Sequence, residues 1–174
     1  MSIINALSYG LSLSCDRSQT HPLSNMPKQK SAKVLLSVLV VATTLVSIAA
    51  DWNSSHVFNP DWSPHAKFHD IMLLTLLTGL MPILLWLLWR KSAEPEVAVK
   101  VTTAILVTFW GSFYLNYLIP GTSPRAFADV PPPSLGGLPL YPNMVVAAII
   151  IVLSLIAYGL YSNGAKAIAE SEES

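Results

Sequence analysis

Four long runs of apolar residues, none containing Lys, Arg, Asp or Glu, limit what this chain can fold into. They cover approximately residues 34–50, 71–89, 101–119 and 144–160. A helix that crosses a bilayer needs roughly 17–25 such residues, and a spanning segment must satisfy its own backbone polar groups. Because the runs are continuous rather than alternating, they exclude the strands of a membrane barrel. The sequence therefore predicts an all-α fold, an integral membrane bundle of four transmembrane helices.

The composition agrees with a surface that faces lipid. Hydrophobic residues make up 52% of the 174 residues and charged residues only 11%, whereas a soluble domain carries about 25% charged residues. The formal net charge is zero, which argues against nucleic acid as a partner. A single cysteine, Cys15, excludes an internal disulfide and a cysteine-rich metal site. We expect the lipid bilayer to be the main partner, in a multi-pass protein.

The basic residues predict the orientation of the bundle. Six of them lie before the first run or beside the short second connector: Lys28, Lys30, Lys33, Arg90, Lys91 and Lys100. The two longer connectors, residues 51–70 and 120–143, hold only Lys67 and Arg125. Cytoplasmic loops carry the excess of Lys and Arg. Both termini are therefore expected to be cytoplasmic, and the longer connectors to lie on the outer side.

Three parts of the chain are expected from these patterns. Residues 1–32 are polar, and they predict a disordered cytoplasmic N-terminal tail. Residues 33–162 form the four-helix transmembrane domain. Residues 163–174, which include three glutamates close to the end, form an acidic C-terminal tail.

The first outer connector, residues 51–70, holds most of the groups that can do chemistry. It reads DWNSSHVFNPDWSPHAKFHD and contains three of the four histidines, His56, His65 and His69. Ser63 followed by Pro64 is typical of a helix start, with Ser as the N-cap and Pro at the first helical position. The second helix therefore begins at Pro64, and His65 and His69, four residues apart, lie on one helical face.

One interpretation of this connector is a metal site. Two imidazoles one helical turn apart can bind the same ion, with zinc or iron as the candidate cofactor. The ligands would be His65 and His69. The sequence leaves the further ligand open among the remaining candidates: His56, Asp51, Asp61 and Asp70.

A second interpretation is acid–base catalysis without a metal. A histidine beside a carboxylate can exchange protons at neutral pH, and at the membrane boundary it can meet a lipophilic small molecule. The candidate catalytic residues are His56, His65, His69 and Asp70. Asp70 is an ionisable group where the second helix enters the apolar zone, which favours a function, although Lys67 can also pair with it. The third interpretation is structural: the histidines hydrogen-bond within the loop and close the outer end of the bundle.

The same connector carries a resemblance to a known group of proteins. Residues 52–69 match the pattern W-N-x-S-H-x-x-N-P-x-W-x-P-H-A-x-F-H, and Pro120-Gly121-Thr122 follows the third run. These motifs resemble those of a family of small, uncharacterised four-helix membrane proteins, and the resemblance covers about residues 33–162. The family pattern has Pro-Pro where this chain has Ser63-Pro64. The resemblance implies the fold and no activity.

Two kinds of function follow as hypotheses. The chain is a membrane enzyme that acts on a lipophilic small molecule by acid–base chemistry, or it is a non-enzymatic ligand-binding, transport or structural component of the membrane. The sequence leaves open whether it is an enzyme.

Overall fold

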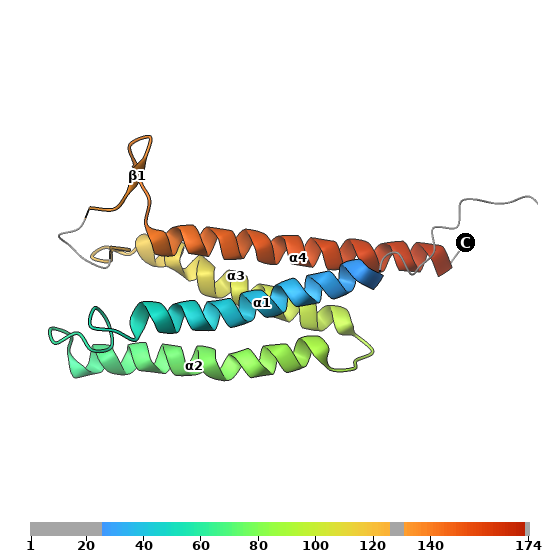
Figure 1. The fold of residues 1–174 in the computed structure, drawn as a ribbon, viewed down its shortest axis with the longest axis horizontal. Coiled ribbons are helices and arrows are strands. Elements are labelled where there is room, and N and C mark those ends of the chain that lie inside the picture. Colours follow the sequence, from blue (N-terminus) through green and yellow to red (C-terminus); the bar gives the residue numbers. More distant parts are fainter. Residues whose placement is uncertain (1–25, 126–130, 173–174) are drawn as a thin grey trace, which may run out of the picture.

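The computed structural model describes residues 26–125 and 131–172. Within them lie four helices and one short antiparallel hairpin (Figure 1). The elements are α1 (Met26–Asp51), α2 (Pro64–Trp89), α3 (Pro95–Tyr117), β1 (Ser134–Leu135), β2 (Leu138–Pro139) and α4 (Pro142–Glu172). Each helix is long and apolar enough to cross a membrane. The predicted all-α fold with four such helices is confirmed, whereas the orientation of the termini stays a prediction.

The helices are longer than the apolar runs that predicted them. Helix α1 begins at Met26, within the predicted N-terminal tail, and helix α4 continues through most of the acidic tail to Glu172. Lys, Gln, Ala and Glu, which are good helix formers, occupy these extensions. The remainder of the predicted N-terminal tail, residues 1–25, lies outside the described residues.

The start of α2 agrees with its sequence signal. Ser63 is the N-cap, and its hydroxyl oxygen accepts a hydrogen bond from the backbone N–H of Ala66 at 3.2 Å. Pro64 occupies the first helical position, where its missing N–H leaves no bond unmade. The predicted start at Pro64 is confirmed, and it fixes the positions of the histidines that follow.

Helix α1 lies in the middle of the bundle. It contacts all three other helices, and α3 also packs along α4. In the part of the chain that the structure describes, α2 contacts α1 and α3 but not α4. Figure 1 shows α2 at one edge of the bundle, so the side of α2 that faces away from α1 and α3 is left uncovered.

Hydrogen bonds join the helices at several depths. Trp110 Nε1 on α3 donates to Thr43 Oγ1 on α1 at 2.9 Å, and this bond is buried. The hydroxyl of Tyr114 donates to the backbone oxygen of Met144 on α4 at 2.7 Å. Such bonds hold transmembrane helices together. Tryptophan, tyrosine and threonine residues thus supply these connecting bonds.

The hairpin lies in the connector between α3 and α4. Gly136 and Gly137 form its turn, with φ values of 58° and 84°. Positive φ at both positions is typical of a type I′ turn, which glycine adopts without strain. Figure 1 shows the hairpin at the same end of the bundle as the α1–α2 connector, so the two longer connectors share that end.

Candidate functional site

The α1–α2 connector is folded by the side chain of Asn53. Its Nδ2 donates to the backbone oxygen of Ala50 at 2.6 Å, which binds a carbonyl left free where α1 ends. Its Oδ1 accepts the backbone N–H of Ser55 at 2.8 Å. Because the amide is held from both sides, its oxygen and nitrogen are assigned. Asn53 thus turns the chain back over the end of α1 and presents Ser55 to the next residue.

His56 is oriented by that arrangement. The hydroxyl of Ser55 donates to Asn53 Oδ1 at 2.6 Å and lies 2.8 Å from His56 Nδ1. A serine hydroxyl has one proton, and here the proton points to Asn53, so the hydroxyl accepts from His56. The network therefore places a hydrogen on Nδ1 of His56. The imidazole also packs edge-on against Trp62, with ring centroids 5.3 Å apart, which restricts its rotation.

The other ring nitrogen of His56 faces a carboxylate. Nε2 lies 3.6 Å from Oδ1 of Asp51, and the two side chains are 27% and 21% exposed. With Nδ1 protonated, a neutral ring would point a lone pair at a carboxylate oxygen, which is repulsive. A proton between the two groups removes the repulsion, either on the imidazole or on the carboxyl. Asp51 and His56 thus form a pair that can give or take a proton.

Asp70 supplies a second carboxyl group near the Asp51–His56 pair. It lies within electrostatic range of both Asp51 and His56. Its Oδ2 is buried and has no hydrogen-bond partner among the described residues. An unpaired buried polar atom costs free energy. Two carboxyls beside one imidazole cannot both be ionised without cost.

A large cavity opens beside this pair. Its volume is about 960 Å³, within the usual range of small-molecule sites, which is roughly 300–1,000 Å³. Asp51 and His56 lie in its wall, and three aromatic rings, those of Trp110, Phe113 and Tyr141, line other parts of it. The wall combines the end of α1, the ends of α3 and α4 that face the longer connectors, and residues of both connectors. We call it the outer cavity.

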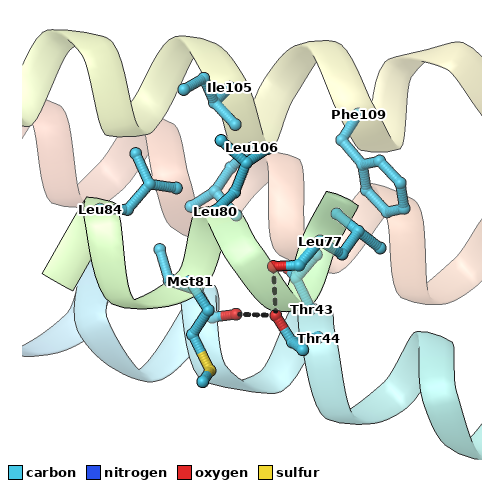
Figure 2. A pocket seen from close by; sticks show the side chains of 10 residues that line it. Thr43, Thr44, Leu77, Leu80, Met81, Leu84, Ile105, Leu106 and Phe109 are labelled. Carbon is cyan, nitrogen blue, oxygen red and sulfur yellow. Dashed lines mark hydrogen bonds between the residues drawn. The ribbon is translucent and has the colours of Figure 1, made fainter. Parts of the chain in front are cut away.

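Below the outer cavity lies a small apolar one, lined by side chains of α1, α2 and α3. Figure 2 shows the hydroxyl of Thr44 in its wall, bonded to the backbone oxygen of Leu77 at 3.5 Å. The cavity has a volume of about 20 Å³, which is room for about one water molecule. Thr43 lines it, and Trp110, its bonding partner, lines the outer cavity. The Trp110–Thr43 bond therefore lies between the two spaces.

The other two histidines lie elsewhere. His65 and His69 are exposed on α2, and their Nε2 atoms are 3.0 Å apart. They share one helical face, as predicted, but neither lines the outer cavity. The part of the chain that the structure describes contains no group of three or more His, Cys, Asp or Glu placed to hold a metal ion. The further ligand that a metal at this pair would need is not found there.

The sequence patterns thus identify part of the candidate site, but they do not identify Asp51 as one of its central residues. Of the four predicted catalytic residues, His56 and Asp70 are brought near each other, while His65 and His69 form a separate pair. Asp51, considered only as a metal ligand, is the residue that faces His56. One signal for Asp51 was available, because an acidic residue directly after an apolar run sits at the membrane boundary, where ionisable groups favour function.

Comparison with known proteins gives a family without an activity. A family model described as a family of unknown function (DUF6640) matches residues 35–167, in agreement with the expected uncharacterised family. No curated protein matches the chain, and no solved structure matches it. The loop pattern of residues 52–69 stays a prediction as a mark of the family.

Proposed function

Since the chain belongs to the DUF6640 family of unknown function, which supplies no activity, we propose a function from the outer cavity itself. The chain is a multi-pass membrane protein that binds a lipophilic small molecule in this cavity, and His56 with Asp51 exchanges a proton with that molecule. The observation that carries the proposal is the position of the Asp51–His56 pair in the wall of a cavity of about 960 Å³.

The cavity suits a molecule that is mostly apolar with one polar group. The rings of Trp110, Phe113 and Tyr141 supply a flat apolar surface. Polar side chains, among them those of His56 and Arg125, line other parts of the wall. Ligand sites typically combine such a lining with a small number of polar groups that fix orientation. A polar group of the ligand placed at His56 would meet an imidazole and a carboxyl oxygen that lie 3.6 Å apart.

Proton exchange is the chemistry that this pair supports. The hydroxyl of Ser55 fixes one side of the imidazole, and Asp51 stabilises positive charge on the other. A pair held in this way can give its proton to the ligand at one position and take a proton back from another position, so that no net proton is gained or lost. Among the predicted catalytic histidines, we therefore assign the acid–base role to His56 and no catalytic role to His65 or His69.

Deuterium incorporation tests this proposal even while the ligand is unidentified. The full-length protein in nanodiscs is incubated in D₂O with a total lipid extract of its source, and retained small molecules are examined by mass spectrometry. We expect a retained molecule that gains deuterium at carbon, where exchange needs a catalyst, with the wild-type protein and does not with His56→Gln. The matched control is His65→Gln, the same chemical change at an exposed histidine outside the cavity, and it should behave as the wild type.

The other outcomes are equally informative. A molecule retained without deuterium gain in every variant contradicts proton exchange and favours the alternative, a non-enzymatic binding or transport component. Absence of any retained molecule contradicts ligand binding in the outer cavity.

A further inference from the structure

The uncovered side of α2 carries a regular stripe of exposed residues. Their spacing alternates between four and three positions, which is the repeat that lets two helices pack along each other. The stripe consists of His65, His69, Met72, Leu76, Gly79, Ile83 and Trp86, and all seven are exposed. Four of them are large apolar residues that are each more than half exposed.

The stripe faces away from the rest of the bundle. The buried residues of α2 are Leu74, Leu77, Leu84 and Leu88, and at 100° per residue they lie between about 80° and 180° around the helix from Leu76 and Ile83. A Cβ atom added to Gly79 would meet nothing within 4 Å. The stripe is therefore open along its whole length, with its smallest residue in the middle.

Two exposed histidines, His65 and His69, lie at the end of the stripe nearest the α1–α2 connector. The Nε2 atoms of His65 and His69 point toward each other and form a hydrogen bond of 3.0 Å, so an ion could replace the proton between them. Zinc takes four ligands in a tetrahedral arrangement. The described residues of one chain bring no third such ligand to this pair, so a second copy of the chain can supply the remaining ligands.

We propose that a second copy of this chain packs its α2 stripe against the first, and that the two histidine pairs together bind one Zn²⁺ ion. Two copies inserted in the same direction are related by a twofold axis along the membrane normal, so each residue of the stripe meets its own equivalent. His65 and His69 then meet the same pair of the second copy, and four imidazoles complete a tetrahedral shell. This inference does not depend on the proposed function of the outer cavity.

Two features favour a second copy of this chain as the partner that covers the stripe. The stripe is self-complementary, because equivalent apolar residues face each other and Gly79 lets the two backbones approach closely. The ligand set is also self-complementary, because two identical pairs supply the four imidazoles that one zinc ion binds. Imidazole ligands in this arrangement suit zinc among the common divalent metals.

The first test measures mass and metal content of the full-length protein in detergent, with EDTA and with added ZnCl₂. We expect a chain that becomes dimeric in zinc and holds about 0.5 zinc ions per chain. In the His65→Ala/His69→Ala variant, zinc affinity should fall at least about tenfold, and the zinc-dependent increase in mass should disappear. The control is His56→Ala, which removes a histidine outside the stripe and should leave both readouts unchanged.

The second test locates the contact by cross-linking in a Cys15→Ser background. Leu76→Cys, on the stripe, should form a disulfide-linked dimer under mild oxidation. Leu73→Cys is the matched control, because Leu73 is also exposed on α2 but points away from the stripe by about a quarter turn, and it should stay monomeric. Zinc should accelerate the reaction at position 76.

Specific results would overturn the proposal. They are a chain that stays monomeric in saturating zinc, a chain that binds one zinc per monomer, or equal cross-linking at positions 73 and 76. Zinc binding that persists in the His65→Ala/His69→Ala variant would also overturn the proposal.

Discussion

The three histidines of residues 51–70 differ in the contacts that hold their rings. His56 is fixed from both sides, by the hydroxyl of Ser55 at Nδ1 and by Asp51 at Nε2. His65 and His69 are exposed and contact each other. A proton-transfer group must keep its orientation through the reaction, whereas a metal ligand must be able to reach an ion. The first description fits His56, and the second fits the pair on α2.

The orientation of the His56 ring depends on the side chain of Asn53, which acts on it through the hydroxyl of Ser55. We predict that Asn53→Ala releases the Ser55 hydroxyl from Asn53 Oδ1, so that it can donate to His56 Nδ1 instead. The ¹⁵N chemical shifts of the His56 ring, which distinguish the two tautomers, should show Nδ1 protonated in the wild type and a mixture in the variant. The protein should also lose about 1–3 kcal/mol of stability through the lost hydrogen bonds.

Asn59→Ala is the matched control for this change. Asn59 also organises the loop, with Nδ2 bonded to Ser55 O at 3.2 Å and Oδ1 accepting from Asp61 N at 2.9 Å, but it does not touch the Ser55 hydroxyl. It should destabilise the protein without changing the His56 tautomer. Identical ring shifts in wild type and Asn53→Ala would refute the assigned network.

The buried carboxyl oxygen of Asp70 leads to a prediction of increased stability, in contrast to the loss expected for Asn53→Ala. Because Oδ2 has no partner among the described residues and Asp51 is nearby, Asp70→Asn should stabilise the protein by about 1 kcal/mol, since a neutral amide costs less to bury than a carboxylate. Unfolding in mixed micelles at neutral pH measures this. A clear loss of stability would mean that the carboxylate of Asp70 is a needed partner of His56.

At the scale of the elements, α1 and α3 are joined by one buried polar contact between two cavities. Trp110 Nε1 donates to Thr43 Oγ1 at 2.9 Å, and the ring of Trp110 forms part of the floor of the outer cavity. The same ring stacks on Phe113, with centroids 5.2 Å apart. The contact therefore sets both the spacing of two helices and the depth of the cavity.

We predict that Trp110→Phe destabilises the protein by about 1–2 kcal/mol, because it removes the bond and leaves the buried Thr43 hydroxyl without this donor. Trp89→Phe is the control, since Trp89 Nε1 also donates to a hydroxyl of α1, that of Ser37 at 2.9 Å, but at an exposed position. Its effect should be smaller. Equal losses in the two variants, measured by unfolding in mixed micelles, would contradict the importance of burial.

The elements also show what the sequence could and could not predict. The four spans follow from apolar length, and the start of α2 follows from Ser63 and Pro64, because both signals are local. The Asp51–His56 contact was missed, because it depends on how Asn53 folds residues 52–55 back over α1. The outer cavity combines residues far apart in the chain, and no local pattern marks such a combination.

At the scale of the whole molecule, the two ends of the bundle differ in charge and in content. Figure 1 shows the start of α1, the α2–α3 connector and the end of α4 at one end, and the two longer connectors at the other. The first end carries most of the basic residues, and the second carries the Asp51–His56 pair and the outer cavity. The orientation of the bundle therefore decides which compartment the cavity faces.

The positive-inside rule predicts that the cavity faces away from the cytoplasm, and single cysteines can test this. In a Cys15→Ser background, Ser134→Cys reports on the hairpin, and Ser92→Cys reports on the α2–α3 connector. Both serines are exposed or nearly so and lie outside the helices, so the substitutions should not disturb the bundle. A membrane-impermeant maleimide should label position 134 in intact cells and position 92 only after permeabilisation. The reverse pattern would place the cavity on the cytoplasmic side, and a proton exchanged at His56 would then come from the cytoplasm.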